Sequence, residues 1–234
     1  MSYYEFLNKI NHNEIKTIFE LGSRDLVDTV KLSNHFNNSK IYAFECNTDC
    51  LIECKKTLAN ITEKDKNRIC LVDKAVSITN GEVTFYPFDL NQYNNMGASS
   101  MLKIDFSLRD PCDPDYNRPN PQTEIKVDGT RLDTFVEENG IKNIDLLCID
   151  LQGYELNAIK SLGHHLHDVK YIITECSISS TYVEGALFQE VNEYLNQYNF
   201  KYISSNRFGE TYPDLSITGF SEFDALFIHT SVLS

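Results

Sequence analysis

Four carboxylates stand at or near the ends of apolar segments: Glu20, Glu45, Asp150 and Glu175. If those segments are parallel strands of one sheet, their carboxyl ends meet at the same edge, where such sheets bind ligands. A desolvated group of negative charges is costly, so it favours a ligand that is cationic or rich in hydroxyl groups. Glu45 ends the second apolar segment, where nucleoside-binding sheets place the acid that contacts a ribose. The pattern indicates a cleft for a cationic or nucleoside-bearing small molecule.

Asp150 and Glu175 are the candidates for acid–base chemistry. A hydroxyl group is a weak nucleophile until a base takes its proton, and carboxylates on adjacent strand ends can reach it. Two acids at close range raise each other's proton affinity, which suits a base. The same pair also suits a shared divalent cation, and its hard oxygen ligands favour Mg²⁺ or Ca²⁺ over zinc. Asp150 is the first candidate base, Glu175 is the second, and the metal role stays open.

The turn after the first apolar segment reads Gly22-Ser23-Arg24-Asp25 and precedes an amphipathic segment. This is the pattern of a strand, a tight turn and a helix whose N–H groups face a ligand. A dinucleotide site needs three glycines to seat a pyrophosphate, whereas Gly22 stands alone and Asp25 takes the place of the phosphate. A carboxylate there repels anions and favours a cation such as S-adenosylmethionine, a sulfonium without phosphate. The alternative is an ordinary βα turn with a good N-cap.

Apolar segments alternate with helical patterns along most of the chain, which predicts an α/β fold. Strands are expected at 15–21, 40–45, 69–72, 144–150 and 169–175, with an antiparallel closing pair at 201–204 and 224–229. The nearly continuous apolar run 144–150 is typical of a parallel strand covered on both faces. Residues 1–14 are expected to form a lead-in helix, and Asn80-Gly81 predicts a hairpin with 82–86 as its second strand.

Two further segments carry specific expectations. Thr48 is the expected N-cap of a helix that ends at Leu58 and turns Leu51, Ile52 and Leu58 inward. Residues 89–122 are rich in turns and prolines, and a segment of this length inside a compact domain is typical of a lid or substrate loop. A surface insertion is the alternative. No repeat or linker interrupts the chain, so we expect a single domain over residues 1–234.

The composition, with 41% hydrophobic and 24% charged residues, is that of a globular protein in water. The net charge of −13 argues against a nucleic-acid partner, which requires a basic face. No apolar run is long enough to cross a membrane, and the first residues do not form a signal peptide. Seven cysteines without such a signal predict free thiols and a cytoplasmic protein. Cys46, Cys50 and Cys54 include no CxxC pair, so we interpret them as buried side chains.

Seven motifs, taken in order, resemble those of the FkbM-type methyltransferase family. They are Phe19-Glu20-Leu21-Gly22, Tyr42-Ala43-Phe44-Glu45, Asp73-Lys74-Ala75-Val76-Ser77, Gly97-Ala98-Ser99-Ser100, Ile149-Asp150-Leu151-Gln152-Gly153-Tyr154-Glu155, Thr174-Glu175-Cys176-Ser177 and Asp224-Ala225-Leu226-Phe227. The string that begins at Asp150, after an apolar strand and with the others in order, is specific. The resemblance covers residues 15–230.

The resemblance implies a Rossmann-like class I methyltransferase fold: a mostly parallel sheet of about seven strands, an antiparallel closing strand and helices on both faces. It implies O-methylation by S-adenosylmethionine of a hydroxyl on a sugar, a glycan or a natural product. The expected cofactor-binding residues are Glu20, Gly22, Ser23, Arg24, Glu45, Asp73, Lys74, Ala75, Ser99, Asp150 and Gln152. The expected acceptor contacts are Ser100, Gly153, Tyr154 and Glu155. For Glu155, a charge at a helix N-terminus is an equal interpretation.

Two other functions compete with this one. A nucleic-acid methyltransferase is disfavoured by the acidic balance, and a degenerate fold that only binds a partner would lack cofactor affinity. We expect a small-molecule or glycan acceptor and no membrane partner, and a homo-oligomer is compatible with the sequence.

Overall fold

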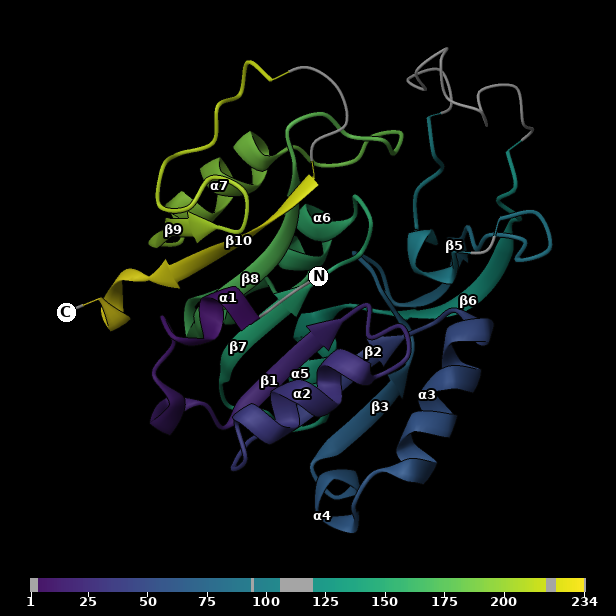
Figure 1. The fold of residues 1–234 in the computed structure, drawn as a ribbon, viewed down its shortest axis with the longest axis horizontal. Helices are drawn as coiled ribbons and strands as arrows, with labels where there is room; N and C mark the ends of the chain where they lie inside the picture. The colour runs from purple at the N-terminus through teal and green to yellow at the C-terminus, as the bar shows by residue number, and fades with distance from the viewer. Residues whose placement is uncertain (1–3, 94, 106–119, 218–221, 234) are drawn as a thin grey trace.

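The computed structural model describes residues 4–93, 95–105, 120–217 and 222–233. Its main element is a seven-stranded sheet in the order β3-β2-β1-β7-β8-β10-β9 (Figure 1). The strands are β1 (Thr17–Leu21), β2 (Lys40–Glu45), β3 (Ile69–Asp73), β7 (Ile144–Ile149), β8 (Val169–Ser177), β9 (Phe200–Ser205) and β10 (Glu222–His229). Only β10 runs antiparallel to its neighbours, β8 and β9. The predicted parallel sheet with an antiparallel closing pair is confirmed.

The strand order reverses between β1 and β7. The chain moves outward from β1 through β2 to β3, and later returns to place β7 on the other side of β1. At such a reversal the connections leave the two strand ends in opposite directions, and open α/β sheets bind their ligands there.

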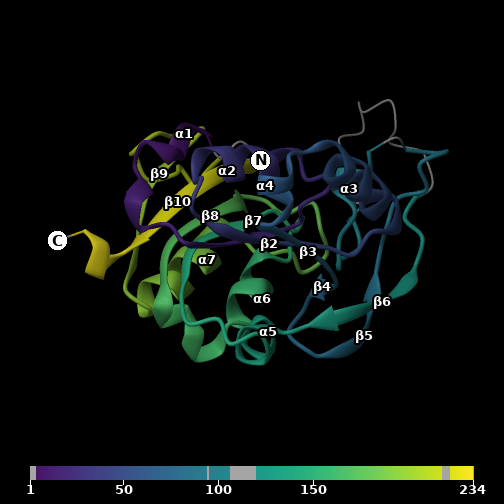
Figure 2. The same ribbon diagram turned by 90° about the horizontal axis from the view of Figure 1, so that it is seen from below.

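Helices cover both faces of the sheet (Figure 2). One face carries α1 (Tyr4–Leu7), α2 (Val27–His35), α3 (Thr48–Asn60) and α4 (Glu63–Lys66), and the other carries α5 (Leu132–Glu138), α6 (Glu155–Lys160) and α7 (Phe188–Gln197). Alternate residues of β2 show the consequence: Ile41 and Ala43 pack on the first face, and Tyr42 and Phe44 on the second. All four are buried, as a doubly covered strand requires.

The lead-in segment is less helical than predicted. It consists of the short α1 and a 3₁₀ helix, η1 (His12–Glu14). Phe6, Leu7 and Ile10 are buried against the α2 side of the sheet, so the amphipathic pattern describes real packing over fewer helical residues. Further 3₁₀ helices are η2 (Met96–Ala98), η4 (Gly163–Asp168) and η5 (Thr230–Val232). None of the helices among the described residues is long and apolar enough to cross a membrane.

A small second sheet has the order β4-β6-β5. It contains β4 (Ala75–Val76), β5 (Gly81–Phe85) and β6 (Ile125–Thr130). The predicted hairpin at Asn80-Gly81 is wrong, because β6 lies between the two strands, parallel to β4 and antiparallel to β5. The local turn signal was present, but the strand that pairs with both sides comes from far along the chain.

The helix α3 differs from its prediction in its cap and its inward face. Asn47, and not Thr48, is the N-cap, and its side chain accepts a hydrogen bond from the backbone N of Asp49. Leu51 is buried as predicted, but Ile52 is 48% exposed. Cys50 and Cys54 are buried instead, since residues four apart lie on the same side of a helix.

The cysteines that the structure describes are free thiols; Cys112 lies outside the described residues. The segment 89–122 is described only in part, because residues 94 and 106–119 are outside that range as well. Its described parts are tied to the rest of the fold by isolated bridges from Tyr86 to Ser100, from Phe88 to Gln122 and from Ile104 to Tyr182.

Candidate active site

A pocket opens at the carboxyl ends of β1, β2 and β7. The space between its walls is about 870 Å³, counting the part open to solvent. The residues singled out from the sequence that line it are Glu20, Gly22, Ser23, Arg24, Glu45, Lys74, Ala75, Ser99, Ser100 and Asp150. Those that lie outside the lining are Asp73, Gln152, Gly153, Tyr154, Glu155 and Glu175. Three of the four strand-end acids therefore share one pocket.

Gly22 lies against the backbone of the neighbouring strand end. Its φ is +86°, and a Cβ there would lie 2.0 Å from the carbonyl oxygen of Asp150. The backbone N of Asp150 donates to Leu21 O at 3.0 Å, and the N–H groups of Gly22 and Ser23 donate to Phe44 O at 3.0 Å. The turn is thus fixed to the ends of both β2 and β7, and only glycine fits at its first position.

Asp25 accepts a hydrogen bond at Oδ1 from the backbone N of Val27, the first residue of α2, at 3.0 Å. Leu26, with a φ of 62°, is the cap residue itself and makes no side-chain cap. The expected carboxylate therefore does stand at this helix start and faces the pocket with Arg24. Its negative charge opposes the binding of a phosphate.

Glu45 is held by three backbone donors from two loops. Its Oε1 accepts from the N–H groups of Cys46 and Asn47, and its Oε2 from that of Arg24, each at 2.8 Å. Burial raises the pKa of Glu45 to about 7, although the three hydrogen bonds act in the opposite direction. Since a carboxylate has about four lone-pair sites, these donors leave room for a ligand hydroxyl.

Glu20 and the residues after β3 complete this wall of the pocket. Glu20 is buried and accepts a hydrogen bond from the hydroxyl of Thr29 on α2. Lys74 and Ala75 line the pocket where β3 passes into β4. The ammonium of Lys74 pairs with Asp128 at 3.0 Å, whereas Asp73 is exposed and outside the lining.

Ser99 and Ser100 connect the segment after η2 to both sides of the pocket. The Oγ of Ser99 accepts from Asn47 Nδ2 and from the backbone N of Phe88, each at 3.2 Å. The hydroxyl of Ser100 donates to Gln152 O at 2.8 Å. Both side chains therefore fix loop positions, and a direct contact with a ligand stays a prediction.

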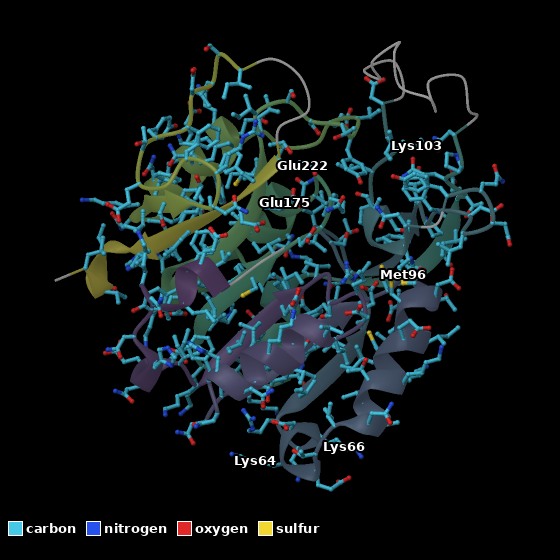
Figure 3. All side chains as sticks on the ribbon, in the orientation of Figure 1. Lys64, Lys66, Met96, Lys103, Glu175 and Glu222 are labelled. Atoms are coloured by element: carbon cyan, nitrogen blue, oxygen red, sulfur yellow. The ribbon has the colours of Figure 1, made fainter. Side chains whose placement is uncertain are left out.

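Asp150 and Glu175 meet through the side chain of Gln152. The Nε2 of Gln152 donates to Asp150 Oδ1 at 2.8 Å and to Glu175 Oε2 at 2.9 Å. Burial first, and then the charge of Asp150, raise the pKa of Glu175 far above its usual range. Glu175 lies outside the pocket lining, behind Asp150, which lines the pocket. Figure 3 shows Glu175 beside Glu222, whose charge acts in the same direction.

Glu155 binds the loop that carries Gln152. Its Oε1 accepts from the backbone N of Leu151 at 2.9 Å and of Gly153 at 3.1 Å, and burial raises its pKa. Tyr154, the buried residue before α6, and Gly153 belong to the same loop. Their contact with an acceptor stays a prediction, since none of the three lines the pocket.

The sequence profile of the methyltransferase FkbM domain matches residues 22–202. The chain belongs to the FkbM methyltransferase family. The family inferred from the motifs is confirmed, and the match extends from the turn after β1 into β9.

The 2-O-methyltransferase NoeI of Sinorhizobium fredii is 26% identical over 172 residues, which are 73% of this chain and 66% of NoeI. The crystal structure of an FkbM methyltransferase from Methylobacillus flagellatus aligns over 92% of this chain and 44% of its own, with 11% identity and a TM-score of 0.49. TrmK of M. capricolum, solved with S-adenosyl-homocysteine, aligns over 97% of this chain and 68% of its own, with 12% identity and a TM-score of 0.51. The match to TrmK confirms the Rossmann-like class I methyltransferase fold. The chain spans about two thirds of the length of NoeI.

Two residues of this FkbM-family site were not predicted. Asn47 caps α3 and donates to Ser99, and an Asn before Thr48-Asp49 is a cap signal that could have identified it. The hydroxyl oxygen of Tyr182 lies 2.9 Å from Gln152 Oε1 and 2.8 Å from Ala98 O. Tyr182 lies in an irregular connection after β8, and no local pattern marks it.

Proposed function

We propose that this chain transfers a methyl group from S-adenosylmethionine to a hydroxyl group of a sugar, a glycan or a natural product. The observation that carries the proposal is the pocket at the strand-order reversal, with Glu20, Glu45 and Asp150 in its lining. The name of NoeI as a 2-O-methyltransferase supports an oxygen acceptor.

The donor and acceptor groups of the pocket fit this cofactor. Glu45 retains acceptor capacity for ribose hydroxyls, and the turn at Gly22 and Ser23 brings backbone close to a ligand. The carboxylates of Glu20 and Asp150 suit an ammonium and a sulfonium, whereas Asp25 opposes a phosphate. When bound, the cofactor supplies a methyl group made electrophilic by the sulfonium.

The residues of the chain contribute proton transfer and orientation. Asp150 lines the pocket and accepts the proton of the acceptor hydroxyl, which makes that oxygen a competent nucleophile. Glu175 lies behind it with a raised pKa, and Gln152 keeps the two side chains at a fixed separation. The loop from Met96, labelled in Figure 3, to Met101 borders the same pocket. It limits the access of water to the pocket.

The charge and the cysteines support two further parts of the proposal. A net charge of −13 disfavours RNA or DNA as the acceptor. The described cysteines are free, which accords with a reducing compartment, and we place the protein in the cytoplasm.

Methyl transfer from labelled S-adenosylmethionine to a panel of monosaccharides, glycans and hydroxylated natural products tests the function. Label is expected in at least one of these acceptors, attached through oxygen. Incorporation into RNA or DNA alone would contradict the proposal. Calorimetry separates the remaining alternative, because a degenerate fold would bind no S-adenosylmethionine.

A further inference from the structure

Gln152 adopts a backbone conformation that few residues other than glycine occupy. Its φ is 53°, and non-glycine residues stay in this region only where the surrounding structure holds them. The conformation directs the side chain between Asp150 and Glu175, where the single amide nitrogen donates to both carboxylates. The strained backbone of Gln152 therefore coincides with hydrogen bonds from its amide to both acids.

The orientation of the Gln152 amide is set from its other end. Its Oε1 faces the hydroxyl of Tyr182 at 2.9 Å, so the oxygen points away from the carboxylates and the nitrogen points toward them. Tyr182 in turn packs against the adjacent glycine: a Cβ at Gly153 would lie 3.0 Å from Tyr182 Cβ. The backbone oxygen of Gln152 accepts from Ser100. Contacts from two distant segments thus hold this residue.

The carboxylates of Asp150 and Glu175 repel each other unless a group between them offsets their charge. Burial and the neighbouring charges of Asp150, Glu155 and Glu222 raise the pKa of Glu175, which reports mutual repulsion at the carboxyl ends of β7 and β8. A divalent cation, an extra proton or a hydrogen-bond donor can each relieve such repulsion. Here an amide N–H group occupies the space between the two carboxylates, and an N–H group is no metal ligand.

Within the part of the chain that the structure describes, no third His, Cys, Asp or Glu ligand atom converges on this pair. Among the described residues, three ligand atoms of His, Cys, Asp or Glu come within 4.8 Å of one another only at Glu137, His164 and His165. That group lies beside η4, which leads into the opposite end of β8. Calcium and magnesium sites use several oxygen ligands, so the donor set at Asp150 does not fit a shared cation.

We propose that Gln152 is a positioning residue whose amide takes the place of a divalent cation between Asp150 and Glu175, and that Tyr182 fixes the orientation of this amide. The pair is then ready for proton transfer without a bound metal ion. The catalytic part of this inference rests on the proposed methyl transfer, whereas the ion-binding part does not.

Ion binding tests the placement of the amide without any activity measurement. Calorimetry with Mg²⁺ and Ca²⁺ on the full chain is expected to show no binding at Asp150. The variant Gln152→Glu places a third carboxylate there and is expected to bind Ca²⁺ with a dissociation constant of about 10⁻⁴–10⁻³ M. Binding by the unchanged protein that is lost in Asp150→Asn would overturn the proposal, as would the absence of any gain in Gln152→Glu.

Kinetics test the positioning role. Turnover is expected to be the same with EDTA or with Mg²⁺. Gln152→Ala is expected to lower kcat about 10²-fold and leave the KM for S-adenosylmethionine within about threefold. It should also move the acidic limb of the pH–rate profile to higher pH, because the proposed base gives up its proton less readily without the amide donor. Tyr182→Phe is expected to cause a smaller change of the same kind.

A merely structural role would lower stability and leave the pH profile in place, and that result would overturn the positioning role. Loss of turnover in EDTA that Mg²⁺ restores would overturn the metal-independent part. If the unchanged protein shows no methyl transfer at all, the proposed function fails while the ion-binding result still decides where the amide acts.

Discussion

Glu45 and the pair Asp150 and Glu175 lie at the same edge of the sheet and are stabilised differently. Glu45, at the end of β2, receives three N–H groups from the backbone. Asp150 and Glu175, beyond β7 and near the end of β8, share one side-chain amide. Backbone donors cannot move without the loops, so they create a rigid wall suited to binding. A side-chain amide that two carboxylates share holds them in place without neutralising either one, which suits the proposed role of Asp150 as a base.

The largest effect is expected at the pair formed by Asp150 and Glu175. Asp150→Asn removes the proposed base with little change in shape, and methyl transfer should fall by a factor of about 10²–10⁴. The protein should remain folded, as circular dichroism can show, and Glu53→Gln, at a partly exposed residue of α3, provides a matched control with unchanged turnover. Near-normal turnover in Asp150→Asn would remove that residue from the role of base.

The turn that begins at Gly22 carries Arg24, one of the backbone donors to Glu45. Gly22→Ala places a methyl group against Asp150 O at a positive φ, and we expect a loss of about 2–4 kcal/mol in the free energy of unfolding. Gly81→Ala is the control, because Gly81 has a φ of +91° and a Cβ added there would meet no atom within 4 Å. Chemical denaturation of both variants separates the cost of φ from the cost of the contact. Equal losses would show that the approach to Asp150 is unimportant.

Glu45→Gln weakens the three backbone hydrogen bonds that hold the end of β2. An amide keeps the size of the side chain but replaces one acceptor oxygen with a donor, so at least one of the three N–H groups loses its partner. We expect the affinity for S-adenosylmethionine to fall roughly 5–30-fold, the equivalent of about 1–2 kcal/mol. The KM for the cofactor should rise more than kcat falls. An effect on kcat larger than the effect on KM would instead place Glu45 in the chemical step, as proposed for Asp150.

Stability should also depend on pH through Glu45. Because burial raises the pKa of Glu45 to about 7 from 4.5, its contribution to stability is complete below pH 4.5 and is lost as the pH rises through 7. The shift corresponds to about 3 kcal/mol. The unfolding free energy of the unchanged protein, measured from pH 5 to 8, should therefore fall relative to that of Glu45→Gln as the pH rises. A constant difference between them would contradict the raised pKa.

The sequence predicted the fold where the signal is local. Residues 40–45 form a strand with the predicted bounds, because an apolar run acts within one segment. The partner of a strand is not a local property, which is why the signal at Asn80-Gly81 did not reveal β6 between its two strands. The prediction that Ile52 faces inward from α3 was wrong for a related reason. Cys50 and Cys54 occupy the buried side of that helix instead.

Site prediction shows the same limit. The acids at the strand ends could be predicted, because parallel strands bring their carboxyl ends together. The family motif drew attention to Gln152, but the bond that joins Asp150 and Glu175 depends on side-chain geometry. Tyr182 contacts Gln152 from a connection 30 residues away, and nothing in its own neighbourhood predicts that contact.

Calorimetric titration with S-adenosylmethionine tests most directly whether the acid-lined pocket holds a cationic methyl donor. We expect one molecule bound per chain, weaker binding to Glu45→Gln, and no heat with NAD⁺, whose pyrophosphate Asp25 repels. No binding of S-adenosylmethionine, or binding of NAD⁺ at the same site, would contradict that claim.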